Sequence, residues 1–102
     1  MIFKIRLIPS AQKEFEEALE YYQKISPRLL QKFYSEFVEL HELLEQNPFF
    51  EIRYSTVRAY KLKSFPYMVH FLINEESKKV IIIAIVFGKM KKTTFEDRKK
   101  NI

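Results

Sequence analysis

The chain of 102 residues has no cysteine and only one glycine, and it has no long hydrophobic run. Without cysteine it can form no disulfide scaffold, thiol nucleophile or cysteine-based metal site. With one glycine it has no glycine-rich loop to cradle a phosphate and no dinucleotide fingerprint. The longest apolar run, Val80–Phe87, is far shorter than the roughly 18 residues of a membrane span. Lys4 and Arg6 interrupt the apolar stretch that a secretory signal would need. We therefore expect a cytoplasmic protein with no role at a membrane.

What the chain does contain suits a folded domain with an uneven charge distribution. Its hydrophobic fraction of 47% is enough to build a core, and its length suits a single domain over residues 1–102. The net charge is +5, but segment 10–51 has four basic and nine acidic residues, whereas segment 52–102 has twelve basic and four acidic ones. This division indicates a basic face for an anionic partner. The alternative is a solvated basic surface without a partner.

The first half of the chain reads as a strand followed by two helices. Residues 2–8 are rich in strand-forming side chains. Over residues 11–25, apolar side chains recur every three or four positions, which predicts an amphipathic helix with Ser10 as its N-cap. Ser26 and the proline after it predict the start of a second helix, which ends near residue 47. The connection is so short that the two helices should pack as an antiparallel hairpin.

The second half reads as strands. Residues 49–57 show no clear period and are expected to be irregular, whereas 58–63, 67–73 and 79–87 have strand patterns. The last of these is apolar at nearly every position and should lie inside the sheet. The order predicts an α+β fold: an N-terminal strand, an antiparallel helical hairpin, and three antiparallel strands forming a mostly antiparallel curved sheet. The tail has room for a short helix capped by Thr94.

Basic side chains gather on one predicted face of the sheet. Alternation along the strand places Lys61 and Lys63 opposite Tyr60 and Leu62, on the face that the helices leave open. Such a face suits a phosphate backbone or an acidic protein surface. The alternative is that strand lysines only discourage aggregation. The candidates for binding a target or a nucleic acid are Arg53, Arg58, Lys61, Lys63, Lys89, Lys91, Lys92 and Arg98.

The next strand brings apolar residues to the same face. Met68 and Leu72 flank His70 there, so we expect a partner segment or the chain's own tail, with Phe95, to cover them. His70 has the chemistry of a general base near neutral pH, although a lone strand histidine more often has a packing role. The two histidines, His41 and His70, lack metal-ligand spacing. We expect no metal, cofactor or small-molecule substrate.

The order and spacing of these segments resemble the RelE/ParE superfamily, the plasmid-stabilisation-type toxins of bacterial type II toxin–antitoxin systems. The resemblance rests on the opening strand, the helical hairpin ending at 47–48, and the segments 58–67, 68–73 and 83–89. It implies a small toxin that a cognate antitoxin neutralises by wrapping around it. One branch of the family cleaves messenger RNA on the ribosome without a metal, and another poisons DNA gyrase.

The residues match the RNA-cleaving branch only in part. Lys61 falls on a catalytic lysine position, but methionines, Met68 and Met90, stand where two arginines are expected. Methionine cannot donate a charge-assisted hydrogen bond to a phosphate. The tail position that would supply an aromatic hydroxyl falls near Phe95 or Glu96, and neither residue has one. The catalytic residues are therefore unknown, and the candidates for a nuclease are Lys61, Lys63, His70 and Lys89.

Three functional hypotheses follow from this comparison. The leading one is growth inhibition by binding a macromolecular target, with DNA gyrase as the family precedent. The second is a ribosome-dependent messenger-RNA endonuclease with a non-standard basic active site. The third is an inactive relic or a protein-binding module with the same fold. In the first two, a cognate antitoxin is a partner, and Met68, Leu72 and Phe95 are its predicted contacts.

Overall fold

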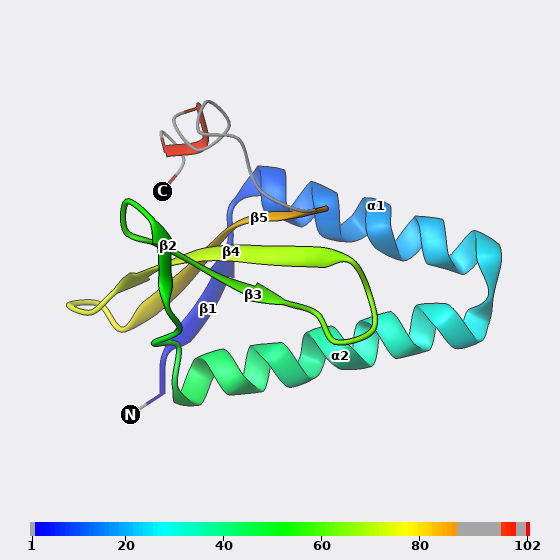
Figure 1. Ribbon diagram of the computed structural model, residues 1–102, viewed down its shortest axis with the longest axis horizontal. Helices are drawn as coiled ribbons and strands as arrows, with labels where there is room; N and C mark the ends of the chain where they lie inside the picture. The colour runs from blue at the N-terminus through cyan, green and yellow to red at the C-terminus, as the bar shows by residue number, and fades with distance from the viewer. Residues whose placement is uncertain (1, 88–96, 100–101) are drawn as a thin grey trace.

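The protein is built from one five-stranded sheet and two antiparallel helices packed beside it (Figure 1). The computed structural model describes residues 2–87, 97–99 and 102. The predicted α+β fold is confirmed. No helix within these described ranges is long and apolar enough to cross a membrane. The elements in chain order are β1 (Lys4–Leu7), α1 (Pro9–Ile25), α2 (Pro27–Gln46), β2 (Ile52–Tyr54), β3 (Val57–Lys61), β4 (Tyr67–Asn74) and β5 (Lys79–Phe87).

The two helices start in different ways. The hydroxyl of Ser26 accepts hydrogen bonds from two backbone N–H groups in the first turn of α2, at 3.2 and 3.5 Å, which confirms it as the N-cap. The prediction that Ser10 is an N-cap is wrong, because α1 already begins at Pro9. The N-cap position is Ile8, which makes no side-chain hydrogen bond to the helix. Proline is favoured at the first helical position, where its missing N–H has no helical partner to lose.

The sheet has the strand order β1-β5-β4-β3-β2. β1 pairs in parallel with β5, and the other neighbours are antiparallel. β5 therefore lies inside the sheet, as predicted, and its residues from Val80 to Ile85 are all buried. The expectation of an irregular segment over 49–57 is wrong at Ile52–Tyr54, which forms β2, and at Val57, where β3 begins. The strand β2 has only three residues and a register shift against β3, so its sequence is too short to show a period of two.

The helices bury their apolar stripes against one face of this sheet. Phe33 of α2 is fully buried at the centre, with ring centroids 5.3 Å from Tyr22, 5.3 Å from Phe65 and 5.5 Å from Tyr67. Ile25, expected in the stripe of α1, is instead 54% exposed, because it is the last residue of that helix. One face of the sheet thus packs against the helices, and the other points away from them.

Candidate functional site

The register of β3 and β4 defines the sheet face that points away from the helices. Ala59 pairs with His70, and Lys61 pairs with Met68. Directly paired residues lie on the same face of a sheet. Tyr60 alternates to the other face, where it lines a pocket with residues of α2. The structure therefore brings Lys61, Met68 and His70 together, as the sequence pattern predicts.

This face is largely covered rather than open. Lys61 is exposed, but His70 is only 3% exposed. The ring of Tyr54, from β2, lies with its centroid 6.1 Å from that of His70. Burial raises the pKa of the Tyr54 phenol, and the positive charge of Arg98 opposes this shift. Tyr54 of β2 thus lies over His70, and His70 is not positioned to meet a substrate from solvent.

Arg98 is partly buried and is bound by Glu14 of α1. Two guanidinium nitrogens of Arg98 lie 2.8 and 2.9 Å from the two carboxylate oxygens of Glu14, and the side chains are 17% and 21% exposed. Arg98 Nη1 also donates to the carbonyl of Ile83 at 2.8 Å, while the N–H of Ile85 donates to Glu14 Oε1 at 3.0 Å. For Arg98 to bind a target, as predicted, these contacts would first have to break. The sequence gives no signal for this pair, because its members lie 84 positions apart.

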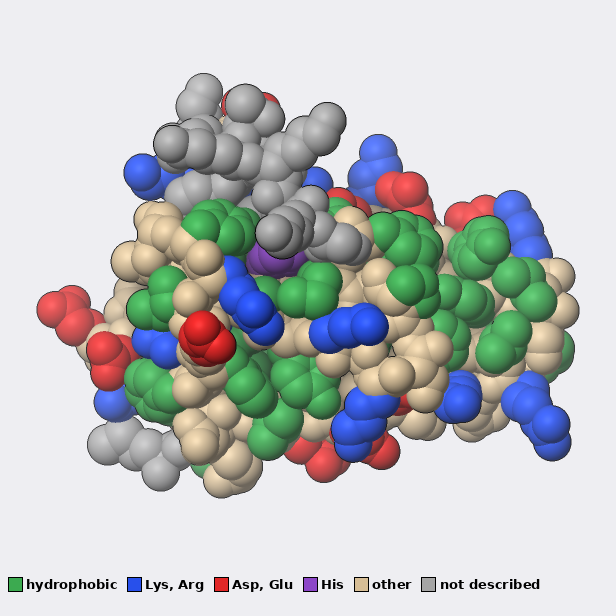
Figure 2. Space-filling model, in the orientation of Figure 1, with side chains coloured by type: hydrophobic (Ala, Val, Ile, Leu, Met, Phe, Trp, Pro, Cys, Tyr) green, Lys and Arg blue, Asp and Glu red, His purple; other side chains and the backbone are tan. Residues whose placement is uncertain are grey.

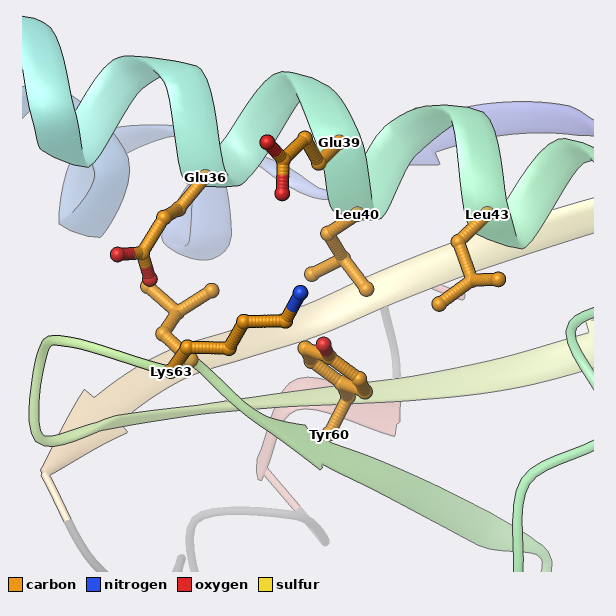
Figure 3. A pocket seen from close by; sticks show the side chains of 7 residues that line it. Glu36, Glu39, Leu40, Leu43, Tyr60 and Lys63 are labelled. Atoms are coloured by element: carbon orange, nitrogen blue, oxygen red, sulfur yellow. The ribbon is translucent and has the colours of Figure 1, made fainter.

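Lys63 is not on the face of Lys61. Figure 3 shows its ammonium group turned toward α2, across a pocket of about 180 Å³. Beside it, Oε1 of Glu36 accepts the backbone N–H of Ser64 at 3.1 Å. The predicted shared face is wrong because β3 ends at Lys61, so strict alternation does not extend to position 63. The pocket is lined by Glu36, Glu39, Leu40, Leu43, Tyr60, Leu62 and Lys63.

The predicted arginines of the second half have different roles. Arg58 donates from Nη1 to the carbonyl of Phe50 at 2.7 Å, and its guanidinium carbon lies 5.4 Å from the centre of the Phe49 ring. It therefore fastens the segment between α2 and β2, whereas Arg53 on β2 is exposed. In the view of Figure 2, the Lys and Arg side chains of the described residues stand apart from one another among hydrophobic and other side chains. Lys89, Lys91, Lys92, Thr94 and Phe95 lie outside the described residues.

Exposed apolar surface occurs at the expected residues and also elsewhere. Met68 and Leu72, predicted to contact an antitoxin, are half-buried. A groove of about 400 Å³ runs between α1 and the end of β5, where Tyr21 is 56% and Phe87 61% exposed. Sequence reasoning missed this groove because Tyr21 lies outside the main apolar stripe of α1. In the described part of the chain, no three metal-ligating side chains come together.

The fold of this chain is the fold of the RelE/ParE toxins. A chain of the chromosomal ParDE toxin–antitoxin system from P. aeruginosa superposes with a TM-score of 0.70 at 19% identity, covering 86% of this chain and 98% of that one. A chain of the intact E. coli RelBE toxin–antitoxin complex superposes with a TM-score of 0.56 at 16% identity, covering 86% of this chain and 99% of that one. A chain of the archaeal RelE–RelB complex from Pyrococcus horikoshii OT3 superposes with a TM-score of 0.55 at 18% identity, covering 85% of this chain and 96% of that one. No family model and no curated protein matches the sequence.

Proposed function

We propose that this protein is the toxin of a type II toxin–antitoxin system, which inhibits growth by binding a macromolecular target and is neutralised by a cognate antitoxin. The proposal is supported by the fold, which is shared with chains of ParDE and RelBE toxin–antitoxin complexes. It is also supported by the half-buried Met68 and Leu72 on the sheet face, since partly exposed apolar side chains on a strand suit a partner segment.

The observation that favours binding over RNA cleavage is the burial of His70, which is 3% exposed. Metal-independent cleavage of RNA requires a group that takes the proton of the 2′-hydroxyl and cations that stabilise the phosphate. The imidazole of His70 lies beneath the surface, and the guanidinium of Arg98 is bound to Glu14. Exposed Lys61 stands beside Met68, which offers no hydrogen-bond donor to a phosphate. These residues supply a point charge for binding rather than a cleavage site.

DNA gyrase is the target that we propose for this toxin. The support is the family precedent together with the weak match to a nuclease site. In this arrangement Lys61 and Arg53, both exposed, contribute positive charge to the surface that meets the target. The antitoxin would cover the apolar residues of the same face, so that target and antitoxin compete for it. The second candidate, a ribosome-dependent messenger-RNA endonuclease, depends on Lys61 as well, and it is retained as an outcome of the experiment.

The test expresses the chain from an inducible promoter with and without the protein encoded beside it. Growth is measured with each expression. In parallel, DNA supercoiling by gyrase is measured in the presence of the purified chain, and RNA 5′ ends are mapped on translating ribosomes. We expect growth arrest and loss of supercoiling, with both effects reduced several-fold by Lys61→Ala. Lys24→Ala is the matched control, because Lys24 is an equally charged residue that is 74% exposed on α1, away from this face. It should leave both effects unchanged.

Other outcomes contradict specific parts of the proposal. RNA cuts on the ribosome that disappear in Lys61→Ala, with supercoiling intact, would establish the endonuclease. Growth that continues normally despite soluble, folded protein would establish an inactive relic. Growth arrest that the neighbouring protein does not relieve would contradict the antitoxin.

A further inference from the structure

The strand β5 extends well beyond its parallel neighbour β1. β1 pairs with β5 only as far as Leu7 opposite Ile82, and the N–H of Ile8 then donates to the carbonyl of Ile82 at 3.1 Å. β5 continues to Phe87. Along residues 83–87, therefore, the edge of β5 that faces away from β4 has no strand partner among the described residues. Unpaired strand edges are templates for pairing with another chain.

Two side chains stand in for the missing strand. The guanidinium of Arg98 donates to the carbonyl of Ile83, and the carboxylate of Glu14 accepts the N–H of Ile85. The same two groups bind each other through two hydrogen bonds of 2.8 and 2.9 Å. One backbone acceptor and one backbone donor of the edge are thereby occupied, as a paired strand would occupy them. We call this arrangement, Glu14 and Arg98 on β5, the edge clamp.

The segment behind the edge clamp is unusually suited to self-pairing. Val80–Phe87 contains no charge, proline or glycine, and its side chains are mostly β-branched. Such segments form strands with their own copies when their edges become accessible. Beside them lies the groove between α1 and β5, where Tyr21 and Phe87 are exposed and Glu14 and Glu17 of α1 also line the wall. An added strand would bury this apolar surface.

We propose that the β5 edge at Ile83–Ile85 is a self-association site, which the edge clamp closes in the monomer and β5 of a second copy occupies when the clamp opens. Antiparallel pairing of β5 with itself is self-complementary, because the same donor and acceptor groups face each other across a two-fold axis. The segment Val80–Phe87 itself carries no charge that would repel its own copy. The second copy is therefore the partner with matching hydrogen bonds and matching apolar surface. The proposal does not depend on the toxin assignment.

The test compares purified full-length variants by sedimentation velocity over a range of concentrations, with amide hydrogen exchange read at Ile85. We expect the native chain to be monomeric and Arg98→Ala to form dimers or larger species. In dilute Arg98→Ala, the Ile85 amide should exchange at least about fivefold faster, because its acceptor Glu14 is no longer held in place. Glu14→Gln should give a smaller effect, since the amide oxygen still accepts from Ile85 while the charge pairing is lost. Glu14→Gln also serves as the test if Arg98→Ala does not fold.

The matched controls are Glu20→Gln and Lys24→Ala. They disrupt an exposed i,i+4 ion pair on the same helix, with side chains 66% and 74% exposed, and should behave like the native chain. A lysine on an edge strand blocks pairing, so adding Val86→Lys to Arg98→Ala should restore the monomer. The proposal is overturned if Arg98→Ala stays monomeric while Ile85 exchanges faster, or if Ile85 exchange does not change. It is also overturned if the variant associates and Val86→Lys does not reverse this.

Discussion

Replacing Phe33 by alanine should remove a large part of the packing between the helices and the sheet. Phe33 is fully buried, and its ring contacts come from both helices and from the β3–β4 connection and β4. Truncating a buried phenylalanine to alanine costs about 3–5 kcal/mol, against a typical total stability of about 5–15 kcal/mol. Its aromatic neighbours, at centroid distances of 5.3–6.4 Å, are Phe15, Tyr22, Phe37, Phe65 and Tyr67.

The loss can be measured by urea and thermal unfolding followed by circular dichroism. Because each kcal/mol shifts Tm by about 4–8 °C in a domain of this size, Phe33→Ala should lower Tm by at least about 12 °C. Tyr34→Ala is the matched control, since Tyr34 is the next residue of the same helix and is 53% exposed. It should cost less than about 1 kcal/mol. A similar, small loss in both variants would refute the placement of Phe33 at the centre of the core.

Two further predictions concern a helix cap and the response to pH. Ser26→Ala should lower the free energy of unfolding by about 1 kcal/mol in urea, because it removes the side-chain acceptor at the start of α2. Ser10→Ala should have no comparable effect, because Ser10 does not cap α1. Burial, followed by the nearby Tyr22, raises the pKa of Tyr67 above its ordinary value in the folded state. The unfolded chain then releases this proton first, near pH 10, so stability should fall as the pH rises above about 10. Tyr67→Phe should flatten that fall in unfolding experiments at alkaline pH, and an unchanged pH dependence would contradict it.

The main elements of the fold could be predicted because each has a strong local pattern. The stripe of α2, with Phe33, Phe37, Leu40 and Leu44, is buried as its spacing requires. The uniformly apolar sequence of β5 likewise indicates a strand covered on both faces. The short strand β2 could not be predicted, because three residues with an irregular register have no detectable period.

The candidate site was harder to predict because its geometry depends on contacts between distant residues. The face shared by Lys61, Met68 and His70 follows from strand alternation, which is local. The position of Lys63 depends on where β3 ends, and the burial of His70 depends on Tyr54 from another strand. The pairing of Arg98 with Glu14 joins the first helix to the C-terminal segment. Charge counting assigns Arg98 to the surface, whereas its actual partner can be identified only from the fold.

The parallel pairing of β1 with β5 joins two segments that are synthesised far apart in time. Lys4 lies opposite Lys79, so β1 has no neighbour in the sheet until β5 has been made. The helical hairpin, whose contacts are local, can form much earlier. Its apolar stripe stays exposed until the strands that cover it have been made. A chain released before β5 is made would contain β2, β3 and β4, with Lys61 and His70, but it would lack the strand that joins them to β1.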